Sequence, residues 1–555
     1  MLSKDMRITL LAASALLLAA PAFADTLIDN ANGLQVDAQG KLQRFTGLVI
    51  GRDGRVVRLL GRGDARPAGV EARIDAGGRT LLPGLIDAHG HVMGLGLGAI
   101  QLDLVGTRSI AELQQRLRDY AAANPGQGWI LGRGWNQEYW SDKRLPTSAD
   151  LDAAVAGRPV WLERVDGHAS VGNKAALRAA GITAATKAPK GGRIENGLFV
   201  DAATALVSAK IPTTSPAQYD RALAEAQRLL LANGLTAVAD MGTSIDDWNA
   251  LRRLGDSGQL QVRVMSYSAD IAPLLSIAGA RPTEWLYDGR LRMAGIKLYA
   301  DGALGSRGAW LKAPYHDMPS TRGLSLIDDA ALKAVAMRAA AGGFQVAIHA
   351  IGDQANDQVI GTFEALTAAY PGDRRWRIEH AQVLDVADLP RLAKSGIIAS
   401  MQPTHQTSDR TMAEARLGPK RLGGAYAWQT LARSGVTLAF GSDFPVELPN
   451  PFHGLGAAVS RQGLDGQPAG GWRPAERVSF EAALAGFTRG AAFAGLAEDR
   501  IGSLDPGKYA DFILVDRDVG VVAPGELALT QVLETWVGGK QVWARAANAG
   551  VAPAR

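Results

Sequence analysis

The chain has 555 residues, of which 47% are hydrophobic and 21% charged, and its formal net charge is +4. A single hydrophobic core stops growing at about 250–300 residues, so we expect one large domain and an accessory domain. The small net charge, with lysine and arginine dispersed along the chain, predicts no nucleic-acid partner. Because the chain has no cysteine, disulfides, thiolate nucleophiles and cysteine-ligated zinc are excluded.

The N-terminus has the layout of a secretory signal peptide. Lys4 and Arg7 precede an apolar stretch over residues 8–20, and Ala22-Phe23-Ala24 forms an A-x-A cleavage site. The apolar stretch is shorter than the ~20 residues that cross a bilayer. We therefore expect residues 1–24 to be removed on export across the inner membrane, which leaves a mature protein without a membrane segment, placed in the periplasm.

Both ends of the mature chain are rich in short strand patterns. Residues 47–60 alternate around Asp53-Gly54, a dipeptide that is a strong hairpin signal. Residues 501–543 show similar apolar runs separated by turns. We therefore expect a small β-sandwich domain built from both termini, residues 25–82 and 496–555.

Between these ends the chain alternates apolar strands with alanine-rich helices, such as the helix expected over residues 330–342. This alternation indicates parallel βα units. Eight strand ends can be counted, which predicts an α/β fold, a closed (β/α)₈ TIM barrel over residues 83–495. The connection after the first strand is too long for one βα loop, so an inserted α/β subdomain is expected at about residues 99–220. The expected strands cover residues 85–91, 236–240, 262–267, 296–301, 345–349, 377–380, 397–402 and 437–443.

The first of these strands ends in the most informative segment, Leu85-Ile86-Asp87-Ala88-His89-Gly90-His91. Alternate residues of a strand point to the same side, so His89 and His91 can present two imidazoles to one point. This is a geometry for metal ligands. An H-x-H pair can also arise by chance, but several later apolar runs likewise end in ionisable residues, at the barrel end where active sites lie. The residues in question are Lys297, His349, His380 and Asp443.

Together these motifs resemble the amidohydrolase superfamily. The ordered set includes Asp-x-His-x-His after Pro83-Gly84, the strand-end lysine and histidines, Gly441-Ser442-Asp443, and Gly-x-Leu-x-Pro-Gly-Lys-x-Ala-Asp over residues 502–511. The segment from Lys297 to Arg307, together with Asp166-Gly167-His168, is similar to the amidohydrolase-3 branch, which includes N-substituted formamide deformylases. The resemblance covers nearly the whole mature chain.

The resemblance implies a metal centre with one or two divalent ions, and the histidine-rich ligand set favours Zn²⁺. His89 and His91 would bind the more buried ion, and His349 and His380 the second. Lys297 would bridge the two as a carbamate formed with CO₂. Burial of a lysine lowers its pKa and favours the neutral amine that takes up CO₂. An ordinary lysine paired with Asp301 is the alternative.

The resemblance gives Asp443 two roles. It would complete the first ion's ligands and act as the general base for hydrolysis by a metal-activated hydroxide, passing the proton to the leaving nitrogen. A helix N-cap is the alternative for Asp443. His168, Arg307 and His405 fall in loops expected near the barrel mouth, where they would bind the substrate. For Arg307 an internal salt bridge is equally compatible with the sequence.

The expected function is hydrolysis of an amide-like C–N bond outside peptide chains, in a small molecule such as an N-substituted formamide or an acylamide. A mononuclear cyclic amide or imide hydrolase and an N-acyl amino acid deacylase are alternatives within the enzyme class. A non-catalytic periplasmic binding protein on a hydrolase scaffold is the alternative from another class, and the complete set of ligand positions disfavours it. The sequence leaves a homo-oligomer open.

Overall fold

The structure is a computed structural model that describes residues 24–164, 169–189, 192–201 and 203–546. The expected signal peptide, but for Ala24, and His168 lie outside these residues. Eight parallel strands form the central barrel in the order β6, β13, β14, β15, β16, β17, β18 and β19. Their bounds are Leu85–Gly90, Leu235–Thr243, Arg263–Ser268, Leu291–Tyr299, Gln345–Ala350, Arg377–His380, Ile398–Met401 and Leu438–Phe440.

The last strand returns to the first. The amide of Asp443 donates to the carbonyl of His89 at 2.7 Å. Both the amide and the hydroxyl of Ser442 donate to the carboxylate of Asp87, which projects from β6. These bonds draw the segment after β19 against β6, and the α/β barrel predicted from the sequence is confirmed.

Helices cover the outside of the barrel. In α7, Ser244 caps the first turn and exchanges hydrogen bonds with Asp247. Trp248, Leu251 and Leu254 follow at a spacing of three, so they share one face, which is buried. The barrel helices are α1 (Val92–Ile100), α6 (Pro216–Ala232), α7 (Ile245–Asp256), α8 (Ile271–Ala278), α9 (Asp329–Ala341), α10 (Asp353–Ala369), α11 (Leu389–Lys394), α12 (Pro403–Leu417), α13 (Trp428–Arg433), α14 (Pro451–Ser460), α15 (Phe480–Gly486) and α16 (Arg489–Ala494).

Strands from both termini form one further sheet, in the order β22-β21-β20-β5-β1-β2-β3, with β4 paired to β1. Apolar side chains from both ends of the chain, such as Leu48 and Phe512, share its core. The sandwich expected from both termini is thus one continuous sheet. The strands are β1 (Ala24–Val36), β2 (Leu42–Gly51), β3 (Val56–Leu60), β4 (Ala72–Asp75), β5 (Thr80–Pro83), β20 (Phe512–Val515), β21 (Val532–Val537) and β22 (Lys540–Ala544).

This terminal sheet is joined directly to the barrel. Only Gly84 separates β5 from β6, and its amide donates to the carbonyl of Asp511, just before β20. The carboxylate of Asp511 also pairs with Arg263 of β14 at 2.7 Å, and both side chains are buried. The terminal sheet therefore supports the start of β6, the strand that carries His89.

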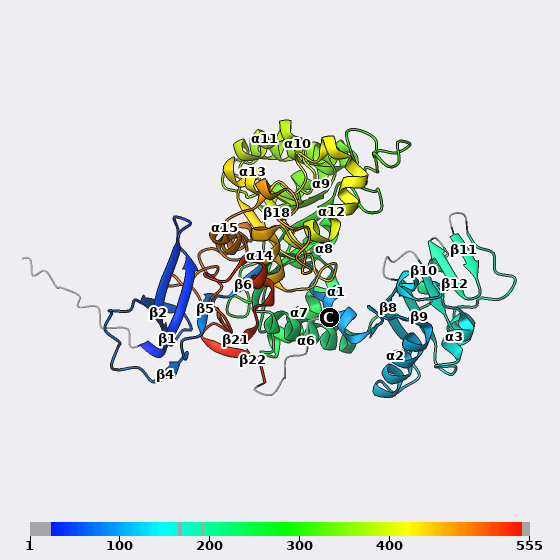
Figure 1. Cartoon of the computed structure of the whole chain (residues 1–555), viewed down its shortest axis with the longest axis horizontal. Helices are drawn as coiled ribbons and strands as arrows, with labels where there is room; N and C mark the ends of the chain where they lie inside the picture. The colour runs from blue at the N-terminus through cyan, green and yellow to red at the C-terminus, as the bar shows by residue number, and fades with distance from the viewer. Residues whose placement is uncertain (1–23, 165–168, 190–191, 202, 547–555) are drawn as a thin grey trace, which may run out of the picture.

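The insertion after α1 has its own six-stranded sheet, in the order β11-β12-β10-β9-β8-β7. Its separate apolar core includes Leu113, Trp135 and Leu162. Figure 1 shows this unit to one side of the barrel, away from β1 and β2. Its elements are β7 (Leu102–Asp103), α2 (Ile110–Ala123), β8 (Ile130–Trp135), α3 (Ser148–Asp152), β9 (Val160–Arg164), β10 (Ala169–Gly172), α4 (Lys174–Ala179), β11 (Gly192–Glu195), β12 (Leu198–Asp201) and α5 (Ala205–Ser208).

Short 3₁₀ turns complete the chain at Gln137–Tyr139, Val386–Asp388, Pro419–Arg421, Pro474–Glu476 and Pro524–Leu529. Within the residues that the structure describes, no helix combines the length and apolar character that crossing a bilayer requires.

Candidate metal centre

The strand ends place the predicted ligands around one cavity of about 360 Å³. Parallel barrel strands all end on the same side, so residues far apart in sequence meet there. The cavity is lined by His89, His91, Lys297, Tyr299, Ala303, Leu304, Gly305, His349, Ile351, His380, Gln382, His405, Asp409, Met412, Asp443, Val446 and Glu447.

The tightest group consists of His89, His380 and Asp443, which are all buried. Each offers a ligand atom, and these atoms lie within 4.8 Å of one another. Nε2 of His91 lies 3.0 Å from Oδ1 of Asp443, and Nε2 of His89 lies 3.4 Å from the same oxygen. Imidazoles and a carboxylate at these separations fit a single divalent cation between them.

His349 adds a further nitrogen to this group. Its ring centroid lies 4.6 Å from that of His380. Its buried Nε2 makes no hydrogen bond to any residue that the structure describes, and it lies 3.4 Å from Oδ1 of Asp301. A buried imidazole nitrogen without a partner is costly unless something binds it, and a metal ion would satisfy it.

A buried ion pair between Glu379 and Arg377, which was not predicted from the sequence, orients the imidazole of His89. Nδ1 of His89 lies 2.6 Å from Oε2 of Glu379, and Arg377 donates to Oε1 of the same carboxylate at 2.8 Å. Burial would raise the pKa of Glu379, but Arg377 and His89 outweigh it and hold that pKa well below its usual range. The pair therefore turns Nε2 of His89 toward the centre, as carboxylates do for metal-binding histidines.

His380 is oriented by a different kind of partner. Its Nδ1 lies 2.8 Å from Oε1 of Gln402, which leaves Nε2 for the cavity. The backbone of His380 has φ 74°, and that of Asp443 has φ 59°. These left-handed conformations cost free energy in residues other than glycine and concentrate at functional sites. At β17 the left-handed turn lets Glu379 and the next residue, His380, both reach the interior.

Lys297 is 1% exposed, and its Nζ lies 3.2 Å from Nε2 of His89. Burial lowers the pKa of Lys297 to about 8, the direction that carbamate formation requires. The alternative pairing with Asp301 is not what the structure shows. The carboxylate of Asp301 instead accepts hydrogen bonds from the amides of Trp310, Ile351 and Gly352.

Of the three residues assigned to substrate binding, His168 lies outside the described residues, and the other two lie in different settings. His405 lines the cavity from α12, with its Nε2 3.8 Å from Oδ2 of Asp443. Arg307 does not line the cavity; it pairs with Asp317 at 2.9 Å, which is the salt-bridge alternative. The N-cap alternative for Asp443 is also not seen, because α14, the next helix, is capped by Asn450.

A parallel barrel that gathers histidines, a buried lysine and an aspartate at its strand ends defines a metal-dependent hydrolase. A family model described as "Amidohydrolase family" matches residues 72–543. The chain therefore belongs to the amidohydrolase family.

Known proteins resemble nearly the whole chain. It is 36% identical over 491 residues to Protein LONG AFTER FAR-RED 3 of Arabidopsis thaliana, which covers 84% of this chain and 82% of that protein. It is 29% identical over 557 residues to an N-substituted formamide deformylase of Arthrobacter pascens, covering 93% of this chain and 97% of that enzyme. The crystal structure of an uncharacterized metal-dependent hydrolase from Pyrococcus horikoshii OT3 matches with a TM-score of 0.75 at 30% identity, covering 90% of this chain and 99% of that one.

Proposed function

We propose that this chain is an exported hydrolase of a C–N bond outside peptide chains, with N-substituted formamides as the first substrate class to consider. The observation that carries the proposal is the buried convergence of His89, His380 and Asp443 at one end of the barrel. The similarity to an N-substituted formamide deformylase over 93% of this chain supports the bond type.

The residues present fit a divalent metal, zinc first. Burial lowers the pKa of His89 to about 4 and that of His349 to about 3, so both imidazoles are neutral and able to ligate near neutral pH. His89, His91, His349, His380 and Asp443 would hold one or two ions, with Lys297 as a bridging carbamate after uptake of CO₂. A divalent ion bound there supplies an activated water and polarises the scissile carbonyl.

Asp443 is the proposed general base. Burial would raise its pKa, but the neighbouring His89, His91 and His380 hold that pKa well below its usual range, so the carboxylate is ionised. It is placed to take the proton from the attacking water and to give it to the leaving nitrogen. His405, close to the second oxygen of Asp443, is placed to donate a hydrogen bond to the carbonyl oxygen of the substrate.

The test combines metal analysis with turnover. The protein is purified without chelator and its metal content per chain is measured. The mass of the intact protein then shows whether CO₂ is bound, as expected at Lys297. We expect about two metals per chain and release of formate from N-substituted formamides. His349→Ala should lose metal and turnover together, while His316→Ala, outside the cavity lining, should retain both. Full turnover by metal-free protein would refute the proposal.

A second candidate is a mononuclear centre with an unmodified Lys297, acting on a cyclic amide or imide. One observation favours it: His89, His380 and Asp443 form the one tight group of potential metal ligands found in the described part of the chain. Metal content near one per chain, unchanged in Lys297→Ala, would support this candidate. Metal binding with no turnover of any amide would instead revive the non-catalytic binding protein.

Export is proposed from residues 1–24 alone. Expression of the whole chain in a Gram-negative host, followed by fractionation, should place a form that begins at Asp25 in the periplasm. A cytoplasmic protein with an intact N-terminus would contradict this part of the proposal.

A further inference from the structure

One wall of the metal cavity is formed by α12. His405, Asp409 and Met412 are spaced four and three residues apart, so they share a face of this helix, and all three line the cavity. Asp409 makes no ion pair within the described residues and takes no part in the ligand group described above. Burial raises the pKa of Asp409, although the neighbouring His405 opposes this shift. A cation bound beside this carboxyl group would therefore favour its ionised form.

The carboxylate of Asp409 is fixed through one of its two oxygens. Oδ2 accepts a hydrogen bond from the hydroxyl of Tyr426 at 2.9 Å and one from Nε2 of Gln382 at 3.2 Å. Gln382 also donates to Tyr426 at 2.6 Å, which closes the network. Oδ1 accepts no hydrogen bond from any described residue. A held carboxylate with one free oxygen beside a cavity is a receptor for an N–H donor.

Apart from Lys297 and the histidines, the described cavity lining holds no basic side chain. Arg307 is held by Asp317 outside the cavity. Glu447 lines the cavity as well, so the non-ligating charges here are Asp409 and Glu447, both acidic.

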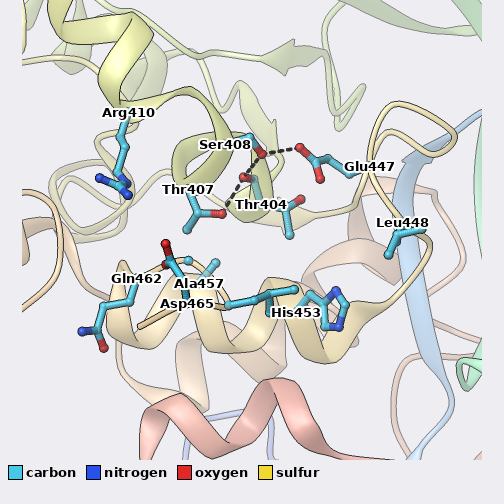
Figure 2. A pocket seen from close by; sticks show the side chains of 12 residues that line it. Thr404, Thr407, Ser408, Arg410, Glu447, Leu448, His453, Ala457, Gln462 and Asp465 are labelled. Carbon is cyan, nitrogen blue, oxygen red and sulfur yellow. Dashed lines mark hydrogen bonds between the residues drawn. The ribbon is translucent and has the colours of Figure 1, made fainter. Parts of the chain in front are cut away.

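The nearest arginine on α12 faces elsewhere. Arg410 lines a neighbouring pocket of about 390 Å³, together with Thr404, Thr407 and Ser408. Figure 2 shows Arg410 in this pocket, and on its wall the hydrogen bond from Ser408 to Glu447, the residue that both pockets share. Asp409 and Arg410 are thus consecutive residues that belong to different pockets, and Arg410 does not neutralise the metal cavity.

We propose that Asp409 determines specificity by binding a protonated amine on the substrate, and that the cavity selects against substrates with a carboxylate at that position. The inference rests on the proposed function and narrows it to amides that carry a second, cationic amine, such as a monoformylated diamine. An N-acyl amino acid would set its carboxylate against Asp409 and Glu447. Asp409 does not take part in proton transfer; it binds and orients the end of the substrate away from the scissile bond.

The test measures binding, because it must not depend on turnover. The probes are phenethylammonium, 2-phenylethanol and 3-phenylpropanoate, which share a ring and chain and differ in charge. Each is titrated calorimetrically into the zinc-loaded full-length protein near neutral pH. Phenethylammonium should bind the wild type about tenfold or more tightly than the alcohol, as expected for a hydrogen bond to a charged group. Equal affinities would overturn the proposal without any variant.

Variants then assign the effect to one side chain. Asp409→Asn should weaken phenethylammonium binding about 10- to 100-fold, leave 2-phenylethanol nearly unchanged and strengthen 3-phenylpropanoate. Arg410→Gln, the adjacent residue in the other pocket, should change none of the three. Unaltered phenethylammonium binding in Asp409→Asn would refute the role of Asp409. If Asp409→Asn fails to hold zinc, Glu447→Gln serves as the second variant. It should weaken phenethylammonium binding by less than the 10- to 100-fold expected for Asp409→Asn and leave the other two probes unchanged. Unchanged phenethylammonium binding in Glu447→Gln would count against a binding role for the acidic residues of the cavity.

Formamide turnover is measured separately on the wild type. Failure of the proposed function can then be distinguished from failure of the specificity role of Asp409. Preference for the ammonium probe without hydrolysis of any N-substituted formamide would remove the proposed function and keep the binding role of Asp409. Hydrolysis of formamides without that preference would keep the function and remove the specificity assignment.

Discussion

The ends of β6 and β17 deliver histidines to the same cavity by different means. His89 lies in β6 and His91 directly follows this strand as the N-cap residue of α1, and His89 is anchored by the ionised Glu379. At β17, His380 needs a left-handed backbone and is anchored by the neutral amide of Gln402. Both histidines were predicted as ligands from the sequence, so the comparison teaches that a strand-end pattern can identify a ligand whose strained backbone and anchoring partner it does not reveal.

Asp443 joins the two strand ends, so its loss should have the largest effect. Asp443→Asn keeps the shape but removes the base, and kcat/KM should fall about 100- to 10,000-fold in steady-state hydrolysis by zinc-loaded protein. Asp465→Asn, an exposed acid of the neighbouring pocket, is the control and should match the wild type. A loss below about tenfold with metal content unchanged would show that another group takes the proton.

The two anchors can be compared directly. Glu379→Gln should weaken zinc binding about 10- to 100-fold, because carboxylate partners orient metal-binding histidines and raise their basicity. Gln402→Leu should weaken it less, since a neutral amide orients His380 without adding charge. Competition with a chromophoric chelator measures both affinities. Equal losses would remove the distinction between the two strand ends.

The pH dependence of metal reactivation extends the comparison to a third strand, β15. Lys297 lies within this strand, in regular backbone. Burial lowers the pKa of Lys297 to about 8, so the amine is protonated below that pH and neutral above it. Uptake of CO₂ needs the neutral amine. With dissolved CO₂ held at a fixed concentration, reactivation of metal-free protein by zinc should therefore slow about tenfold for each pH unit below 8, measured as recovered turnover. Lys297→Arg should recover nothing, and a flat profile would favour an unmodified lysine.

The smallest effect is expected at Arg307, which also has a left-handed backbone, with φ 58°. Its guanidinium is committed to Asp317 outside the cavity, so Arg307→Ala should lower kcat/KM less than about threefold. His405→Ala should cost clearly more in the same assay. A large loss in Arg307→Ala would mean that the segment around it changes its contacts when substrate binds.

Much of the barrel could be predicted, because its strands are apolar runs and several of them carry a polar residue at or just beyond the C-terminal end. The boundaries were less accurate. The expected strand 437–443 is Leu438–Phe440, since Ser442 and Asp443 leave the ladder to bond Asp87 and the backbone of His89. The expected strand 296–301 begins earlier, at Leu291.

The supporting residues could not be predicted, because their partners lie far away in the sequence. Glu379 was visible beside His380, but its bond to His89 spans 290 positions. Asp409 gave no signal at all: its position on the cavity face of α12 depends on how that helix packs. The ligand assignments remain predictions for the experiments above, and the domain boundaries also remain predictions.

The pairing of β5 with β20 also bears on the order in which the molecule is made. A ribosome delivers β5 and β6 early, but the strand that completes their sheet lies close to the other end of the chain. A growing polypeptide therefore cannot finish the support behind His89 until synthesis is almost over. If the chain is exported unfolded, in line with the export proposed above, this delays the capture of metal until the chain reaches the periplasm. A chain truncated before residue 512 should accordingly purify without metal, which elemental analysis would check.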